Sequence, residues 1–230
     1  MEEARGPMGL RKDLHIKALT ETPEIRGRWA EIKGKDPDQG DVDAMFADFV
    51  PMQLDCLGDY TALLPGVAEV VQRLQKQGIK IGSTTGFVRP MVDILEEDAK
   101  KQGSLPDASV AGDEVEHGAR PKPFMVYRNL DLMDIHPIQS VVKVDDTGSG
   151  VGEGLEAGCW AVGIARYSNY LNINSIAEAD EISAEEFQDR LAFTRDQLWR
   201  TGAHYVIDEP IELLGVIDDM NARLASGEKP

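Results

Sequence analysis

The sequence predicts an α/β protein in which an N-terminal α-helical cap domain precedes a doubly wound parallel sheet. Up to about residue 63 the hydrophobic residues follow a helical period, and no segment there reads convincingly as a strand. After Pro65 and Gly66, short β-branched runs alternate with helical segments, a pattern typical of parallel sheets with helices on both faces. We therefore expect a cap at residues 1–63 and an α/β core at 64–230.

The elements follow in order along the chain. In the cap, Leu14, Ala18 and Leu19 share one helical face, and a second helix is expected over 42–57. In the core, Gly78 ends the first helix. Helices are predicted at 67–77, 89–102, 124–133, 150–157, 184–201 and 209–224, and strands at 79–84, 108–111, 141–144, 160–164 and 204–207. The acidic run 178–186 is interpreted as a solvated linker and the start of a helix.

Composition excludes several classes of partner. The formal net charge of −17 argues against nucleic acid and anionic membranes, so an anionic substrate would need a locally positive pocket. Cys56 and Cys159 lie far apart, which predicts reduced thiols in a cytoplasmic protein. The sequence contains neither an apolar run long enough for a membrane span nor the apolar stretch of a signal peptide at its start.

Residues 141–150, VVKVDDTGSG, are the most informative segment. A β-branched run ends in Asp145 and Asp146 and then in a turn of small residues. Carboxylates at the carboxyl end of such a strand can hold a hard cation such as Mg²⁺ beside a phosphate. Turn chemistry alone also places Asp after strands and is the competing explanation.

Two further segments offer groups for a phosphoryl oxygen. In IKIGSTTG, the hydroxyl of Thr85 and the amide of Gly86 follow a strand, although ordinary strand and turn roles remain open. In GARPKPF, Arg120 should lie on a loop ahead of a helix, where its guanidinium could neutralise a phosphoryl group. Lys122 competes for that role, and a solvated arginine is the alternative.

The order of these segments, a hydroxyl strand, a basic loop and paired acids, resembles the haloacid dehalogenase superfamily of phosphoryl-transfer enzymes. Within it, nearly the whole chain resembles the phosphonoacetaldehyde hydrolase (phosphonatase) family. The segments that carry this resemblance are PMGLRKDLHIKAL at 7–19, IGSTTGFVRPMVDIL at 81–95, ARPKPFMVYRNL at 119–130 and GAHYVID at 202–208. The resemblance implies a core that contains a Rossmann-like sheet.

The resemblance also implies residue roles. Lys12 would form an imine with the substrate aldehyde, and Met8 and His15 would belong to the same cap site. The spacing of Lys12 and His15 puts them on one helical face, but without the family Lys12 would read as a solvated helix residue. The implied reaction hydrolyses the carbon-phosphorus bond of phosphonoacetaldehyde to acetaldehyde and phosphate, in the degradation of phosphonates such as 2-aminoethylphosphonate. Thr85, Gly86 and Arg120 would hold the phosphoryl oxygens, Asp146 and Asp145 would bind Mg²⁺, and the cap would form a homodimer.

The chain departs from the family pattern in three places. The nucleophilic aspartate lies in a segment resembling DWAGTTVD, and nothing like it occurs here. Its strand would occupy the middle of the sheet, between the strands at 79–84 and 141–144, so we expect the first central strand to be missing and this form to lack turnover. Phe87 stands where a tyrosine is common. Gly150 stands where many members have a second acid, a role that the adjacent Asp145 would take over.

Two other functions remain open. The chain could be another phosphatase or phosphomutase of the same superfamily, for which Lys12 would be dispensable. It could also be a non-catalytic remnant that binds a ligand or partner through the cap.

Overall fold

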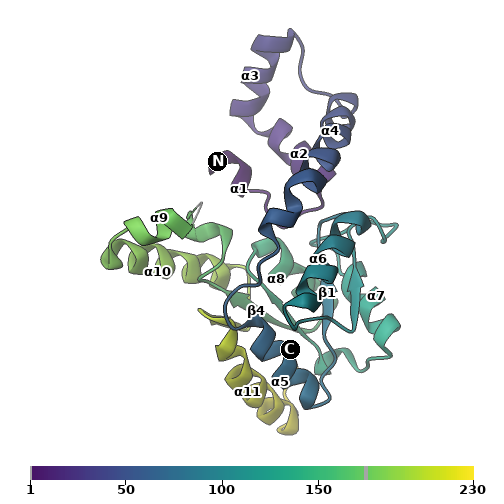
Figure 1. Cartoon of the computed structure of the whole chain (residues 1–230), viewed down its shortest axis with the longest axis vertical. Helices are drawn as coiled ribbons and strands as arrows, with labels where there is room; N and C mark the ends of the chain where they lie inside the picture. The colour runs from purple at the N-terminus through teal and green to yellow at the C-terminus, as the bar shows by residue number, and fades with distance from the viewer. Residues whose placement is uncertain (1, 174–175) are drawn as a thin grey trace.

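The computed structural model describes residues 2–173 and 176–230. Helices form the first part of the chain and project away from the rest of the molecule (Figure 1). They are α1 (Glu2–Arg5), α2 (Lys12–Glu21), α3 (Pro23–Lys33) and α4 (Gln39–Leu57), followed by the 3-10 helix η1 (Gly58–Tyr60). Asp38 and Asp41 form a capping box that starts α4, which begins three residues before the predicted helix. The domain boundary at residues 63 and 64 stays a prediction.

In the described part of the chain, five parallel strands form the core, which confirms the predicted α/β class. They are β1 (Gly82–Thr84), β2 (Ala108–Val110), β3 (Val142–Asp145), β4 (Trp160–Ile164) and β5 (Tyr205–Ile207). They make two sheets, β1-β2 and β3-β4-β5, rather than one continuous sheet. The break lies between β1 and β3, where the sequence predicts that a central strand is missing.

Helices alternate with these strands, as the pattern predicts. They are α5 (Val67–Lys76), α6 (Arg89–Lys101), α7 (Phe124–Met133), α8 (Gly148–Ala157), α9 (Ile176–Glu181), α10 (Ala184–Arg200) and α11 (Leu213–Ala225), with the 3-10 segments η2 (Ile138–Ser140), η3 (Asn169–Leu171) and η4 (Pro210–Glu212). The expected linker at 178–186 is wrong in part. Its first residues belong to α9, and Ser183 accepts a hydrogen bond from the Glu186 amide to cap α10.

The three-stranded sheet is covered on both faces, so the doubly wound arrangement is confirmed. Val162 packs with α5 and α11 residues in one apolar cluster, whereas the neighbouring Ala161 packs with Leu191 and Leu198 of α10 in another. Alternate residues of β4 therefore enter opposite layers. Among the described residues, no helix is both long and apolar enough to cross a membrane.

Strand β1 is shorter than predicted. The sequence favours a buried strand over 79–84, but only Gly82–Thr84 form a strand, and Gly82 is exposed. The Ile81 carbonyl accepts from the amides of Asp107 and Ala108, and the Ile81 amide donates to the Asp107 side chain. Because β1 pairs with a neighbouring strand on one side only, it forms about half of the backbone hydrogen bonds that a central strand would form.

Candidate active site

The carboxyl ends of β1 and β3 meet at one place, although the two strands are not paired. Arg120 joins them: its Nη2 atom donates to the Thr84 carbonyl at 2.7 Å and lies 3.0 Å from Asp145 Oδ2. Because Thr84 ends β1 and Asp145 ends β3, the loops that carry Thr85 and Asp146 start side by side. The predicted hydroxyl loop, basic loop and paired acids thus share one edge of the core.

Arg120 is not a solvated loop residue. Its side chain is buried in a cluster of four charges, where Nε donates to Glu153 Oε2 at 3.1 Å, and Lys143 Nζ lies 2.7 Å from Asp145 Oδ2. Thr84 Oγ1 also donates to Glu153 Oε2, at 2.8 Å. The two positive and two negative side chains neutralise one another in a site shielded from water. Their ion pairs hold the Arg120 guanidinium at the carboxyl ends of β1 and β3.

Both carboxylate oxygens of Asp145 already have hydrogen-bond or ion-pair partners. Besides Lys143 and Arg120, the backbone amide and the hydroxyl of Thr147 donate to its Oδ1 atom. Burial alone would raise the pKa of Asp145, but the Lys143 and Arg120 charges hold it well below its ordinary value. A Cβ atom on Gly150 would lie 2.0 Å from the Asp145 carboxyl carbon. The Asp145 carboxylate therefore occupies the space that a side chain at position 150 would need.

The pKa of Asp146 is shifted in the opposite direction from that of Asp145. Burial raises the pKa of Asp146 to about 6, and the negative charge of Asp145 adds to the rise. Among the ion pairs formed by the described residues, none includes the Asp146 carboxylate. A half-buried carboxylate without a cationic partner among the described residues fits one ligand of a hard cation. Mg²⁺ takes one or two carboxylates and fills its other positions with water and phosphate oxygens.

The metal site would be sparse on the protein side. Within residues 2–173 and 176–230, no three His, Cys, Asp or Glu side chains are grouped so as to hold a metal. The donor set therefore fits Mg²⁺ bound by Asp146 together with substrate oxygens, rather than a closed structural site. The assignment of Asp145 as a second ligand stays a prediction, since its oxygens are already hydrogen-bonded.

Residues 8–12, called here the cap segment, lie directly on the core loops. Ser149 Oγ donates to the Met8 carbonyl at 3.1 Å. Gly9 has φ +85°, and a Cβ there would lie 2.2 Å from Ser149 Oγ. Gly86 is buried against the same segment: its Cβ would lie 2.4 Å from the Leu10 carbonyl oxygen. Glycine is favoured at position 9 by the positive φ and the close side chains of Ser149 and Thr147, and it is needed at position 86 because the Leu10 backbone approaches too closely for a side chain.

Lys12 begins α2 at the point where the cap segment meets the core. Its side chain is half-buried, and Nζ lies 5.1 Å from the centroid of the Phe87 ring. Burial lowers the pKa of Lys12, and the positive charge of Arg120 lowers it further. Phe87 thus presents an aromatic face to the ammonium.

His15 and Met8 complete the cap side. His15 is buried, and its Nε2 atom donates to the Ala4 carbonyl at 2.9 Å, while Nδ1 is buried without a partner. Burial lowers the pKa of His15, as does the charge of Lys12, so the ring is held neutral with a free acceptor nitrogen. The Met8 side chain is exposed. Met8 and Lys12 thus contact Ser149 and Phe87 of the core loops, whereas the hydrogen bond of His15 stays within the cap, and the roles of all three stay predictions.

Lys143 and Glu153 were missed by sequence reasoning. Lys143 lies inside a β-branched run and Glu153 inside a helix, positions at which charged residues are normally solvated. The available signal was that Lys143 precedes Asp145 by two residues, so both side chains must share one face of β3. The burial of Glu153 depends on the packing of α8 against β3 and β4 and has no local signature.

Comparison with known proteins places the chain in a family. No protein-family model matches it. It is 40% identical to the phosphonoacetaldehyde hydrolase of Klebsiella pneumoniae over 230 residues, which is all of this chain and 85% of the relative. It is 37% identical to that of Syntrophobacter fumaroxidans, over 99% of this chain and 82% of the relative.

The chain belongs to the phosphonoacetaldehyde hydrolase family. A solved structure of a phosphonoacetaldehyde hydrolase-like protein from Oleispira antarctica superposes with a TM-score of 0.95 and 35% identity, covering 100% of this chain and 82% of that one. Members of this family are hydrolases of the haloacid dehalogenase superfamily, so the fold and enzyme class inferred from the sequence are confirmed.

Proposed function

We propose that this site serves the hydrolysis of the carbon-phosphorus bond of phosphonoacetaldehyde, the reaction that releases acetaldehyde and phosphate. The observation that carries the proposal is the position of a half-buried amine, Lys12, whose Nζ atom lies 5.1 Å from the Phe87 ring centroid, one residue after Gly86, while the buried guanidinium of Arg120 bridges the carboxyl ends of β1 and β3. An aldehyde and a phosphonate group separated by one carbon need those two kinds of group close together. Relatives with this name support the assignment.

Lys12 would act as the covalent catalyst. Its neutral amine attacks the aldehyde carbon, water leaves, and the protonated imine becomes an electron sink. When the carbon-phosphorus bond breaks, its electron pair enters the iminium system and gives an enamine. Proton addition to carbon and hydrolysis then return the amine and release acetaldehyde. The lowered pKa of Lys12 increases the fraction of amine that is free to attack.

The core residues would hold the phosphoryl group. Thr85 and Gly86 supply a hydroxyl and a backbone amide, and Arg120 supplies positive charge from a fixed position. Mg²⁺, held by Asp146 with Asp145 as the second predicted ligand, would neutralise charge on the transferred group. His15 would accept or return a proton at Nδ1, the ring nitrogen that has no partner.

The phosphoryl group also needs an acceptor. The family resemblance assigns this role to an aspartate on a strand that has no counterpart in residues 1–230. We therefore predict that the 230-residue polypeptide forms the imine but does not turn over. Measurable release of phosphate from phosphonoacetaldehyde by the purified polypeptide would refute this prediction.

Borohydride trapping tests the imine without requiring turnover. Phosphonoacetaldehyde followed by borohydride should label Lys12, located by mass spectrometry after proteolysis. The matched control is Lys17, which is exposed on the same helix. Lys12→Ala should abolish the label and Lys17→Ala should leave it intact. Equal labelling of the wild type and Lys12→Ala would sink the proposal.

We further propose that the protein is a cytoplasmic homodimer formed through the cap. Both cysteines are free. In the cap, Ile32, Met52 and Tyr60 are more than two-thirds exposed, although their side chains are apolar or largely so. Light scattering of the wild type and of Met52→Asp should show a dimer and a monomer, respectively; a monomeric wild type would contradict this.

A further inference from the structure

Helix α1 joins the cap to the core through its last residue. Figure 1 shows α1 between the cap helices α2 and α3 and the part of the core that carries α9 and α10. Arg5 Nη1 donates to the Asn169 carbonyl at 3.0 Å, and Arg5 Nη2 donates to the Ile173 carbonyl at 3.1 Å. Asn169 Nδ2 donates in return to the Arg5 carbonyl at 3.1 Å. We name these three hydrogen bonds the clasp.

The clasp fixes α1 to a loop that is itself held at the candidate site. The Arg5 side chain belongs to a half-buried residue, and a planar guanidinium that binds two carbonyls is restricted in direction as well as in position. On the loop side, Ser168 Oγ accepts from the Tyr170 amide to cap η3 and donates to the Asp146 carbonyl. The clasp therefore connects α1 to the loop of the predicted metal ligand.

On its other side, α1 contacts the helix that begins with Lys12. The carbonyl of Ala4, the residue before Arg5, accepts a hydrogen bond from His15 Nε2 at 2.9 Å. Because a carbonyl oxygen can only accept, Nε2 must carry the ring proton, and Nδ1 of the neutral ring is then the acceptor. Ala4 and Arg5 are adjacent, so the clasp fixes the carbonyl that orients the His15 ring.

The other ring nitrogen of His15 indicates a role in proton transfer. Nδ1 is buried without a hydrogen-bond partner, an arrangement that costs stability and that a purely structural histidine would not need. Lys12 and His15 are three residues apart on α2 and share one face. Nδ1 could take the proton of the Lys12 ammonium before the amine attacks the aldehyde. It could then return that proton to the carbinolamine hydroxyl, which leaves as water and gives the imine.

We propose that Arg5 and Asn169 are positioning residues for His15. The clasp holds the Ala4 carbonyl against Nε2, which fixes the ring and keeps Nδ1 as the proton-accepting nitrogen on the Lys12 face of α2. The imine step of this proposal rests on the proposed function, and the assignment of Arg5 and Asn169 goes beyond it. Proton transfer at His15 would then require α1 to be seated on the core loop.

NMR of the full chain with ¹⁵N-labelled histidine tests the clasp without substrate. The Nε2 proton of His15, assigned by its absence in His15→Ala, should exchange slowly with water in the wild type. Arg5→Met keeps the length of the side chain without its donors, and Asn169→Ala removes the reciprocal donor; each should speed this exchange about tenfold or more. Arg28→Met is the matched control, because Arg28 binds α1 through an exposed ion pair with Glu3 rather than through the core loop.

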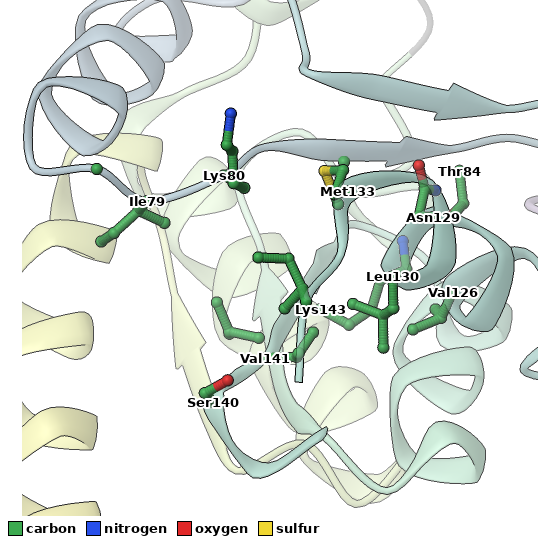
Figure 2. Close-up of a pocket in the computed structure, with 14 residues that line it drawn as sticks. Ile79, Lys80, Thr84, Val126, Asn129, Leu130, Met133, Ser140, Val141 and Lys143 are labelled. Carbon is green, nitrogen blue, oxygen red and sulfur yellow. The ribbon is translucent and has the colours of Figure 1, made fainter. Parts of the chain in front are cut away.

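A second control separates the clasp from general loosening of the fold. Figure 2 shows Asn129 on α7, beside the cavity between β1 and β3. Asn129 is buried and donates to the Ser83 carbonyl at 2.7 Å, so Asn129→Ala also removes a hydrogen bond between distant residues. This variant should be less stable in urea but should leave the exchange of the His15 proton unchanged. Equal acceleration in Asn129→Ala and Arg5→Met would overturn the proposal.

The rate of imine formation tests whether the clasp acts through His15. With phosphonoacetaldehyde and borohydride at fixed pH, the initial rate of Lys12 labelling should fall about tenfold or more in His15→Ala, Arg5→Met and Asn169→Ala. It should stay within about twofold of the wild type in Arg28→Met. In a His15→Ala background, Arg5→Met should cause no further loss. An unchanged rate in Arg5→Met, or a full further loss in that background, would overturn the proposal.

Failure of the proposed function would give a different result. If Lys12 is not labelled even in the wild type, the imine step fails for every variant. The exchange of the His15 proton still decides the clasp in that case. Faster exchange in Arg5→Met and Asn169→Ala, but not in Arg28→Met, would support the positioning of His15, and equal exchange in all variants would refute it.

Discussion

Replacing Asp146 with asparagine should stabilise the metal-free protein at neutral pH. In the folded chain, burial and the charge of Asp145 raise the pKa of Asp146 to about 6, against an ordinary value of 3.8. A difference of about two pKa units corresponds to about 3 kcal/mol of penalty on the ionised form. Asparagine keeps the shape and carries no charge, so Asp146→Asn removes that penalty.

The pH dependence gives the prediction its sign. A carboxyl whose pKa is raised on folding favours the folded state at low pH, and this contribution is lost as the pH rises from about 4 through about 6. The stabilisation by Asp146→Asn should therefore be about 3 kcal/mol at pH 7.5 and about 1.5 kcal/mol at pH 5. Urea unfolding in EDTA at both pH values measures it, with the exposed Asp131→Asn as control.

Mg²⁺ at sufficient concentration should make the wild type more stable than Asp146→Asn. A cation bound by Asp146 in the folded state stabilises the wild type by mass action, and the stabilisation grows with the Mg²⁺ concentration. The unfolding midpoint of Asp146→Asn should respond to Mg²⁺ no more than that of a protein without the site. If Asp146→Asn is destabilised to the same extent at pH 5 and pH 7.5, the carboxylate carries no electrostatic penalty and the reasoning fails.

Three further changes test the packing of the site and core. Gly86→Ala places a methyl group 2.4 Å from a cap-segment carbonyl oxygen and should cost about 1–3 kcal/mol in urea unfolding, whereas Gly27→Ala, in an open helical position, should stabilise by about 0.5–1 kcal/mol. Glu153→Gln leaves the buried cations in excess and should cost about 3 kcal/mol by the same measurement, and the exposed Glu156→Gln on the same helix less than about 0.5 kcal/mol. Leu198→Ala, fully buried under β4, should cost about 2–5 kcal/mol; a smaller loss would mean that this layer is loosely packed.

Local sequence patterns predicted most of the secondary structure because helices and strands depend largely on residues that are close in sequence. The helix at 124–133 and the strand at 160–164 have the predicted bounds. Strand β1 differs because strand length depends on a partner that no local pattern encodes. Helix α9 was missed because its acidic residues suit a solvated linker as well as an exposed helix.

The candidate site, like the fold, could be predicted from the sequence only in part. Asp145, Asp146 and Arg120 follow recognisable strand or loop signals, and the structure brings them to one edge. The distinction between the two acids could not be read from the sequence. It arises from Lys143, which lies two residues before Asp145 on the same face of β3, and from Gly150, which leaves the space that the Asp145 carboxylate fills. The Asp146 carboxylate forms no ion pair among the described residues.

The charge balance of the site explains how a strongly acidic chain can attract an anionic substrate. Asp145 and Glu153 neutralise Arg120 and Lys143 within the buried cluster. Lys12 lies outside that balance: it forms no ion pair among the described residues, and Arg120 repels its proton. An arriving phosphonate therefore meets one unpaired amine and a fixed guanidinium. Its negative charge would raise the pKa of Lys12 again, so imine formation would depend on how the substrate divides its charge between Arg120 and the cation at Asp146.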